Sequence, residues 1–462
     1  MKPLLNVLLL VLISLFAGRV ALATPTPERS ARSGVEAGRA PVRGASASRF
    51  VSASGSDRGR CTQAAPCKTF DRAYEVASPG ETISVAGGTY SATWPEAGAH
   101  AIRGPAKPAG SAPVTFTCTG PVRFDTTAPN FMIYPGLHSL RFTGGCFRFH
   151  VVQIGLGGYS EVVEKITFSG VKMDSFECAG CDNLTIRNSE IGPMVACHGR
   201  GTTGLGTNGG QITPAMWCES SDAGSGSYWA SRPRGNTDVQ AQPYIHNGGA
   251  GMPNNVRLVG NLIHGMQTKD PLNAHTGGVL FWNANGVTMR NNVFRDNAIY
   301  DVLVDGNAAN WVVENNFFGW PLQPLGNGQG AVETPKDWRE FGSKDAVVHR
   351  NWLIRYNSFA HGLDLGRNSL TNVRVIGNIL GTYSSCTPGA SYDSNVVIAA
   401  RTCGTNGKRR SRFPYVNYAA VDFHLRRGIV LPVASRSTDA GLRTDFDGDA
   451  RRAPRSAGAD EQ

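Results

Sequence analysis

The sequence predicts an all-β fold in which short parallel strands stack into one continuous coil, or solenoid. One nine-residue pattern recurs along the chain, with apolar residues at positions two and four, an asparagine at position seven and an apolar residue at position nine. Each copy has too little apolar surface to bury by itself, so neighbouring copies must stack on one another. Glycine is also abundant, with 56 residues, as the many bends of such a coil require.

The clearest copies of the pattern lie in the second half of the chain. They span 255–263, 286–294, 310–318, 351–359 and 372–380, and weaker copies span 139–147, 165–173 and 183–191. From one start to the next, the distances are 26, 18, 72, 31, 24, 41 and 21 residues. Most of these distances fall in the range of stacked structural repeats.

The asparagine at position seven is expected to align from turn to turn. It tolerates left-handed backbone and can bind its counterpart in the next turn, which predicts a ladder along one bend. The alternative is a set of unrelated turn asparagines. The five residues concerned are Asn261, Asn292, Asn316, Asn357 and Asn378.

The first residues predict secretion. Residues 1–23 contain Lys2, an apolar run and a small-residue cleavage site that ends at Ala23, as in a secretory signal peptide. Residues 24–48 are rich in Pro, Ala, Arg, Ser and Gly, which predicts a disordered linker. No later stretch is long and apolar enough to span a membrane.

The ten cysteines are expected to form disulfides outside the cell. Sequence cannot prove their connectivity, and Cys178 and Cys181 lack the second ligand pair that a zinc site needs. Nearest-neighbour pairing gives Cys61–Cys67, Cys118–Cys146, Cys178–Cys181, Cys197–Cys218 and Cys386–Cys403.

The distribution of charge argues against nucleic-acid binding. The formal net charge is +10, but residues 49–400 hold 27 basic and 26 acidic residues, so the excess lies in the two ends. No nucleic-acid-binding motif is present. The expected partner is an extracellular polysaccharide, and the protein is expected to be a monomer.

A short helix is expected before the first coil. Phe70, Ala73, Tyr74 and Ala77 follow helical spacing, and Pro79-Gly80 ends the helix. An amphipathic helix here would cover the open apolar end of the coil, so residues 49–90 are interpreted as an N-terminal cap.

Both ends of the predicted coil resemble one superfamily. The segments 51–57, 66–70, 79–83 and 87–90, with 445–451 and 458–461 at the far end, are similar to those of secreted right-handed parallel β-helix proteins of the pectate-lyase-like superfamily. The resemblance covers about residues 49–462. Asp445-x-Asp447-Gly448-Asp449 also suggests a calcium loop, but it lacks the terminal Glu of that loop, which favours a structural turn.

The pattern is interrupted by a long insertion at 193–253, and residues 413–462 form a C-terminal tail. A long excursion from a solenoid often forms a wall of a binding site. Trp229 in this insertion is a candidate for stacking on sugar rings. The alternative is a loop that is pinned by a disulfide and has no binding role.

An outward row of arginines is the candidate substrate-binding surface. With positions two and four inward, positions three and five face outward. These outward positions hold five arginines, and Glu314 is the acidic residue set against them. The arginines are Arg257, Arg290, Arg355, Arg187 and Arg374. Guanidinium groups bind carboxylates and sulfates in a bidentate manner. The alternative is a solvated outer face without a ligand.

A second set of residues is the candidate catalytic cluster. The resemblance implies proton abstraction by a Lys or Arg, with Ca²⁺ or a cationic side chain neutralising the substrate. Lys269 is the candidate base, because no other lysine lies between Lys172 and Lys336; it is equally interpretable as an ordinary loop lysine. The cluster is completed by His275 and Arg295, and by Asp270, Asp301 and Asp305 as calcium ligands.

Several motifs of catalytic relatives are missing. The hydrolases of the superfamily share a signature that includes Asp-Asp, Gly-His-Gly and Arg-x-Lys. None of these three motifs occurs in this sequence. Gly277-Gly278 stands where many relatives carry Asp-Gly. The sequence therefore leaves two hypotheses: a protein that binds an acidic polysaccharide and cleaves it by β-elimination, and a non-catalytic surface, adhesion or carbohydrate-binding protein.

Overall fold

The computed structural model describes residues 47–460, with gaps at 91–100, 125–129, 156–160, 197–242, 247–251, 269–276, 298–299, 320–337, 342–347, 366–368, 382–383, 385, 400, 419–421, 432, 434–441 and 452–454. All described residues belong to the unit 41–462. The predicted signal peptide and residues 24–46 of the predicted linker therefore lie outside the described residues, as does the Cys197–Cys218 pair. Among the described residues, no helix has the length and apolar character that a membrane crossing needs.

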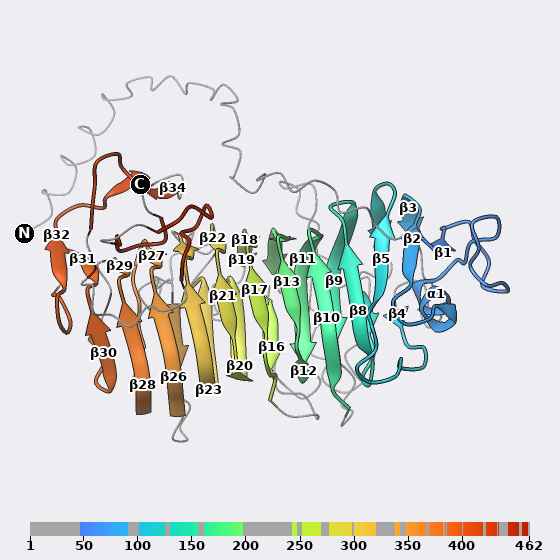
Figure 1. The fold of residues 1–462 in the computed structure, drawn as a ribbon, viewed down its shortest axis with the longest axis horizontal. Coiled ribbons are helices and arrows are strands. Elements are labelled where there is room, and N and C mark those ends of the chain that lie inside the picture. Colours follow the sequence, from blue (N-terminus) through green and yellow to red (C-terminus); the bar gives the residue numbers. More distant parts are fainter. Residues whose placement is uncertain are drawn as a thin grey trace, which may run out of the picture. The chain divides into compact units, whose positions relative to one another are not determined.

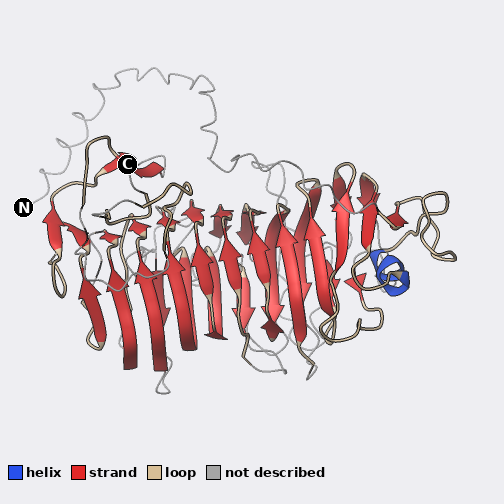
Figure 2. Ribbon diagram, in the orientation of Figure 1, coloured by secondary structure: helices blue, strands red, loops and turns tan. Residues whose placement is uncertain are grey.

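The fold is a parallel β-helix whose strands stack in three rows (Figures 1 and 2). The first row contains β1 (Arg49–Val51), β2 (Thr82–Val85), β5 (Val114–Cys118), β8 (His138–Thr143), β10 (Val163–Ser169), β13 (Thr185–Arg187), β17 (Arg257–Val259) and β21 (Thr288–Arg290). It continues through the second halves of β23 (Val302–Glu314), β26 (Val348–Arg355) and β28 (Ser369–Ile376) to β30 (Ala390–Asp393).

The second and third rows complete each turn of the coil. The second contains β3 (Gly88–Tyr90), β6 (Val122–Phe124), β9 (Phe147–Ile154), β11 (Lys172–Ala179), β14 (Glu190–Ile191), β18 (Leu262–His264), β22 (Val293–Arg295), β24 (Phe317–Phe318), β27 (Ser358–Phe359), β29 (Ile379–Leu380), β31 (Val396–Ile398) and β32 (Lys408–Arg410). The third contains β4 (Ala101–Ile102), β7 (Asn130–Ile133), the second halves of β9 and β11, β16 (Tyr244–His246), β20 (Val279–Asn285), the first half of β23 and β25 (Trp338–Phe341).

Three smaller pairings lie beside these rows. β12 (Cys181–Asp182) pairs with the start of β10, and β15 (Met194–Ala196) pairs with β19 (Met266–Thr268). Both pairings are parallel. The antiparallel pair is β33 (Tyr415–Asn417) with β34 (Asp422–Leu425), which lies in the C-terminal tail.

The strand register confirms the repeat alignment. The third residue of one unit lies opposite the third residue of the next, as Thr167 does to Thr185, Thr185 to Arg257 and Arg257 to Thr288. A ninth copy, at 389–397, was missed in the sequence. It pairs in the same register, with Tyr392 opposite Val375, and Ser391 and Asp393 occupy its outward positions three and five.

The asparagine ladder is present in the structure. Each Nδ2 donates to the Oδ1 of the next turn, over 3.0 Å from Asn261 to Asn292, 2.9 Å from Asn292 to Asn316, 2.9 Å from Asn316 to Asn357, 3.0 Å from Asn357 to Asn378 and 3.1 Å from Asn378 to Asn395. All of these residues are buried. Because an unsatisfied buried amide is costly, each asparagine holds its neighbours in register.

Position one of each unit is a second corner that favours asparagine. Asn310 and Asn351 have φ values of 60° and 59°, in the left-handed region that asparagine tolerates best after glycine. Their side chains also form a ladder, in which Asn351 Nδ2 donates to Asn310 Oδ1 over 2.9 Å. This ladder is exposed to solvent, in contrast to the ladder at position seven.

The predicted helix is α1 (Phe70–Val76), and Thr69 caps it by accepting a hydrogen bond from the N–H of Arg72 over 3.1 Å. Phe70 is buried and packs against Phe116 and Phe131, with ring centroids 5.5 and 5.4 Å apart. These contacts fill the interior at the start of the coil. Four of the expected disulfides are present: Cys61–Cys67, Cys118–Cys146, Cys178–Cys181 and Cys386–Cys403.

The C-terminal tail packs on one bend of the coil. Phe446 stacks on Phe317 with ring centroids 4.2 Å apart, and the Arg451 guanidinium lies 4.3 Å from the centre of the Tyr356 ring. Arg451 also donates to Oδ1 of Asn315 over 2.8 Å. The tail therefore covers position six of the central units and the residues beside it.

Candidate polyanion-binding groove

The outer face of the first strand row carries the candidate site. At position three of four successive units, two threonines lie between two arginines: Arg141, Thr167, Thr185 and Arg257 lie opposite one another in turn on β8, β10, β13 and β17. Successive strands lie about 4.8 Å apart, so Arg141 and Arg257 are separated by about 14 Å along the coil. This spacing suits an extended chain rather than a small ligand.

A groove of about 350 Å³ runs across these strands. It is lined by Ser111, Pro113, Ser139, Arg141, Lys165, Thr167, Asn183, Thr185, Asn255 and Arg257. Three of the lining residues are cationic, and none of those described is acidic. The remaining hydroxyl and amide groups can hydrogen-bond to sugar hydroxyls.

Two corner asparagines position Arg257 over the groove. Arg257 Nε donates to Oδ1 of Asn255 over 3.1 Å, and Nδ2 of Asn255 donates to Oδ1 of Asn183 over 2.5 Å. Asn183 and Asn255 have φ values of 58° and 51°. The left-handed corner thus turns their side chains toward the strand that carries the arginine.

The other two cations come from the neighbouring units. Lys165 is exposed and occupies position one, with a φ of 56°. Arg141 is half-buried, and its Nε has no hydrogen-bond partner among the described residues. A half-buried guanidinium with an unused donor favours binding of an anion.

Charges next to the groove leave it cationic. Arg187 lies at position five of β13, two residues after Thr185 of the groove, and its Nε donates to Oγ of Ser169 over 3.1 Å. Two acids, Glu164 and Asp182, lie one residue before Lys165 and Asn183, respectively. Asp182 Oδ1 accepts hydrogen bonds from the backbone and side-chain nitrogens of Asn254, which compensate part of its charge.

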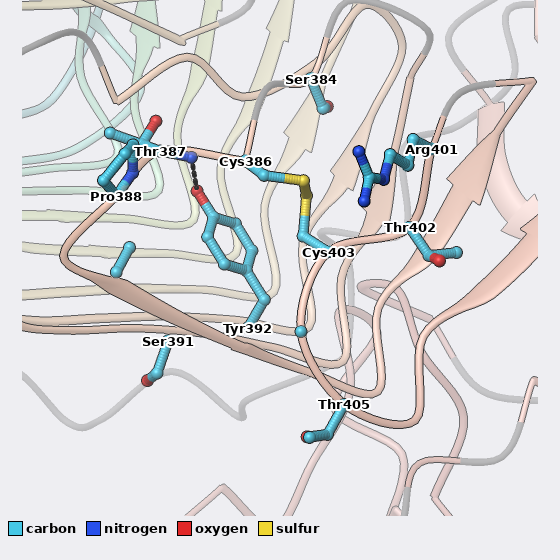
Figure 3. A pocket seen from close by; sticks show the side chains of 12 residues that line it. Ser384, Cys386, Thr387, Pro388, Ser391, Tyr392, Arg401, Thr402, Cys403 and Thr405 are labelled. Carbon is cyan, nitrogen blue, oxygen red and sulfur yellow. Dashed lines mark hydrogen bonds between the residues drawn. A yellow bond between two sulfur atoms is a disulfide. The ribbon is translucent and has the colours of Figure 1, made fainter.

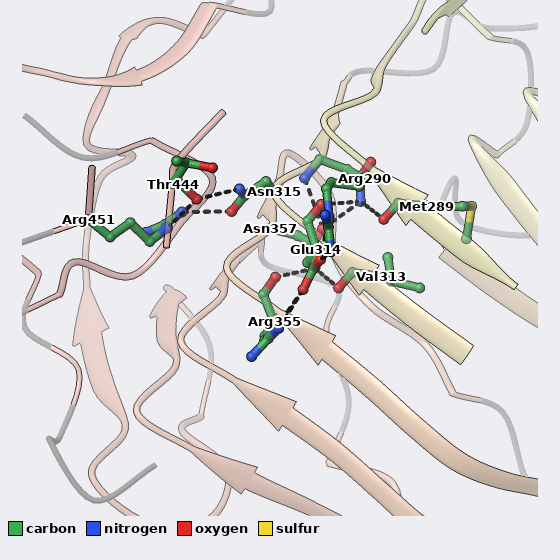
Figure 4. A network of polar contacts seen from close by, with 10 residues as sticks. Met289, Arg290, Val313, Glu314, Asn315, Arg355, Asn357, Thr444 and Arg451 are labelled. Carbon is green, nitrogen blue, oxygen red and sulfur yellow. Dashed lines mark hydrogen bonds and ion pairs between the residues drawn. The ribbon is translucent and has the colours of Figure 1, made fainter. Parts of the chain in front are cut away.

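The predicted arginine row divides into two parts. Arg257 lies in the groove, but Arg355 is buried, and position five does not face solvent at Glu314, Arg355 or Ile376. Figure 4 shows Glu314 between the two arginines of the adjacent turns. Its carboxylate accepts from Nε of Arg290 over 2.5 Å and from Nε of Arg355 over 2.8 Å. The expectation of outward side chains fails here, because Glu314 and Arg355 are buried and pair with each other. The tail contacts the next residues along the chain, Asn315 and Tyr356.

Most of the predicted catalytic cluster lies outside the described residues. This applies to Lys269, Asp270, His275 and Trp229, and to the side chain of Asp305. Their proposed roles remain predictions, as does the Ca²⁺ site.

Asp301 and Arg295 belong to the described part of that cluster. Asp301 is fully buried; Asn297 Nδ2 donates to its Oδ1 over 2.8 Å, and burial raises its pKa well above the usual range. Arg295 lies opposite His264 on the second row. His264, through its hydrogen bond to Glu190, is the main cause that lowers the pKa of Glu190 to about 2. The two predicted residues thus occupy different environments: Asp301 is buried beside Asn297, and Arg295 lies beside the ion pair of His264 and Glu190.

A larger hollow, of about 860 Å³, lies near the C-terminal end of the coil beside the Cys386–Cys403 disulfide (Figure 3). Tyr392 lines it, and its hydroxyl accepts a hydrogen bond from the N–H of Thr387 over 3.1 Å. Arg401 is the single charged residue among the described residues of the lining. The hollow therefore lacks the row of cations that the smaller groove presents.

Comparison with known proteins gives structural neighbours only. Neither protein-family models nor curated proteins match the chain. Among solved structures, the chain is similar to pectate lyase Pel9A, with 12% identity, a TM-score of 0.49 and coverage of 91% of this chain and 98% of that one. It is also similar to XylC in complex with xylose (10% identity, TM-score 0.44, coverage 89% and 98%) and to a rhamnogalacturonan lyase (12% identity, TM-score 0.35, coverage 87% and 99%).

Sequence reasoning found Arg257 but missed the two cations beside it. Arg141 occupies position three of the unit that starts at Ser139, and Lys165 occupies position one of the next. Both units belong to the weaker upstream copies. Applying the outward-position rule to those copies would have identified Arg141, whereas Lys165 requires knowing that the left-handed corner also faces the groove.

Proposed function

We propose that the protein is a secreted carbohydrate-binding protein that holds an acidic polysaccharide along the outer face of the first strand row. The observation that carries this proposal is the groove with Arg141, Lys165 and Arg257 and no acid among its described lining residues. Carboxylates or sulfates along the polymer would meet cations on three of the four strands that the groove crosses, β8, β10 and β17. Secretion is supported by the predicted signal peptide and by the disulfides of the described chain.

Binding to a panel of polymers tests the proposal. We expect the protein to bind uronate polymers such as polygalacturonate and alginate, but not neutral dextran, in affinity electrophoresis or calorimetry. Because the groove is open to solvent, the affinity should fall as salt is raised. Arg257→Glu should weaken binding by about tenfold or more, the effect of losing one charge-assisted contact.

A matched variant controls for net charge. Arg409 is exposed on β32 of the second row, so Arg409→Glu changes the charge by the same amount far along the chain from the groove. Its affinity should remain within about twofold of the parent protein's, well below the tenfold step expected in the groove. Equal losses in the two variants would mean that only the overall charge matters, and the groove would be rejected as the binding site.

Cleavage by β-elimination is the second candidate function. It is favoured by an amine, Lys165, that shares the groove with the guanidiniums of Arg141 and Arg257. A base must accept the proton next to the carboxylate, while cations stabilise the charge that develops. Activity would release unsaturated products that absorb ultraviolet light. Loss of this signal in Lys165→Ala but not in Lys269→Ala would place the base in the groove; the reverse would favour the loop lysine. Binding without any released product would leave a non-catalytic protein.

A further inference from the structure

The C-terminal tail contains a cluster of metal-ligating side chains that the polysaccharide groove does not use. His424 lies on β34, Asp447 on the turn that follows Asp445, and Asp460 two residues before Gln462. One ligand atom from each of the three residues lies within 4.8 Å of the other two. We propose that His424, Asp447 and Asp460 bind one divalent transition-metal ion, for which Zn²⁺ is the appropriate probe.

The histidine is already oriented as a ligand. Its Nδ1 lies 2.5 Å from Oδ1 of Asp422, and its Nε2 lies 3.1 Å from Oδ2 of Asp447. A metal at Nε2 would displace the proton that Nε2 donates to Asp447, while the N–H of Nδ1 continues to donate to Asp422. Metal-bound histidines commonly have this carboxylate partner, so Asp422 would act as a positioning residue.

The buried carboxylate of Asp460 independently supports a cation at this site. It is only 5% exposed, and its described hydrogen bond is from the N–H of Leu425 to Oδ2, over 3.0 Å. Its other carboxylate oxygen has no donor among the described residues. A buried carboxylate requires a counter-charge or a full set of hydrogen bonds. The neighbouring His424 imidazole is the cation that acts on Asp460, and a divalent ion held by both residues would supply a stronger counter-charge.

The charges of the cluster also point to a cation. Three carboxylates, those of Asp422, Asp447 and Asp460, surround one imidazole, and none of them pairs with a lysine or arginine in the described part of the chain. Arg451 is the nearest tail arginine in sequence to Asp447, and its described bonds go to Asn315 and to backbone carbonyls. A divalent ion would balance the excess negative charge.

The geometry favours a transition metal over Ca²⁺. One imidazole nitrogen with carboxylate oxygens suits Zn²⁺, whereas Ca²⁺ takes six to eight oxygen ligands. Ligand atoms at about 2 Å from one Zn²⁺ lie about 3.3 Å apart in a tetrahedral site, which the distance between His424 and Asp447 already meets. Asp445 is not part of the site, because its Oδ1 accepts from the N–H of Asp449 over 2.9 Å and closes the turn. That contact supports the structural-turn interpretation of this motif.

A metal here would join three separate segments of the tail: β34, the turn at Asp447 and the last residues of the chain. The His424 ring packs on Phe317 of the coil with centroids 5.3 Å apart, so the site would also hold the tail on the coil. Binding to the folded state alone raises stability as the metal concentration exceeds the dissociation constant. The inference does not depend on what the groove binds.

Equilibrium dialysis of chelator-treated protein against Zn²⁺, followed by metal analysis, tests the site. We expect one Zn²⁺ per chain above background and a higher unfolding temperature with Zn²⁺ than with chelator. Both effects should be lost in His424→Gln and in Asp447→Asn. The matched control is His150→Gln. His150 lies on β9, far from the tail in sequence, and also contacts a carboxylate, that of Asp174. This variant should bind Zn²⁺ as the parent protein does.

Two results would overturn the proposal. The first is Zn²⁺ binding that is equal in the parent protein and in both site variants. The second is a rise in unfolding temperature with Ca²⁺ but not with Zn²⁺, which would contradict the donor assignment. Asp447 is partly exposed, so Asp447→Asn should fold; unfolding of each variant in chelator shows whether the fold is intact without metal.

Discussion

Asn316 donates a hydrogen bond from Nδ2 to Oδ1 of Asn357, one turn further along the coil, over 2.9 Å. The same amide donates to the carbonyl oxygens of Met289 and Glu314, and its Oδ1 accepts from Asn292. One buried side chain thus joins three turns.

Replacing Asn316 by alanine should destabilise the coil by about 3 kcal/mol, because several buried polar groups lose their partners at once. Asn351→Ala is the matched control: Asn351 belongs to the exposed ladder at position one, where water can replace the lost bonds, and the cost should be below about 1 kcal/mol. Denaturant midpoints of the two variants measure the difference. Equal midpoints would show that burial does not determine how much each asparagine of a ladder stabilises the fold.

Glu314→Gln should also be strongly destabilising. Glu314 is 0% exposed and is the carboxylate between Arg290 and Arg355, of which Arg355 is itself buried. Removing one partner leaves an uncompensated buried charge, which costs about 3–5 kcal/mol. Glu190→Gln provides the comparison, since Glu190 pairs with Lys172 and His264 on a partly exposed surface, and we expect a smaller shift of the unfolding midpoint. A Glu314 variant as stable as the parent would contradict the assigned role of this pair.

Acid should destabilise the protein through its buried histidines. Burial lowers the pKa of His349 and of His361 to about 4, from an ordinary value of 6.5. Between these values the unfolded chain binds protons that the folded chain does not, so stability is present above pH 6.5 and is lost as the pH falls toward 4. The loss is on the order of 3 kcal/mol per histidine.

His349→Gln isolates one of these contributions. The Nε2 of His349 lies 2.8 Å from the carbonyl oxygen of Gly306, and the ring stacks on Trp352, so the variant loses stability at every pH. The informative quantity is the slope of the unfolding midpoint against pH between 6.5 and 4, which should become shallower. An unchanged slope would mean that His349 does not titrate in this range.

Asn255→Ala should weaken polysaccharide binding without changing net charge. Asn255 accepts from Nε of Arg257 and so orients its guanidinium. A freely rotating arginine loses side-chain entropy on binding, which predicts a loss of about threefold to tenfold in affinity. Asn351→Ala changes the same position of a unit outside the groove and should bind as the parent protein does. An unaltered affinity in Asn255→Ala would exclude a positioning role.

The repeat pattern was sufficient to predict the strand register, because apolar positions two and four and the asparagine at position seven leave one alignment of neighbouring units. It was not sufficient to predict exposure on the outer face. Arg355 is buried, and Arg451, nearly one hundred residues later in the chain, packs on the adjacent Tyr356. No local spacing carries that information.

The limits of the local pattern also explain which site residues could be predicted from the sequence and which could not. Arg257 follows from a strong copy of the pattern, whereas Lys165 lies at a corner whose direction depends on its φ of 56°. The His424, Asp447 and Asp460 cluster joins residues that the sequence shows only as scattered acids and one histidine in a tail. Long-range packing, and not residue type, brings them together.

The turns of this coil differ widely in length but return to one register. Asn378 and Asn395 are 17 residues apart, and Ser189 and Asn261 are 72 residues apart, yet each pair is joined by the same backbone-to-amide hydrogen bond. Only the nine-residue unit is constrained, so the segment between two units can be exchanged for another of different length while the stack persists. Such an architecture allows recognition surfaces to be grafted one at a time, and it makes the intervals between units natural sites for engineering new specificities.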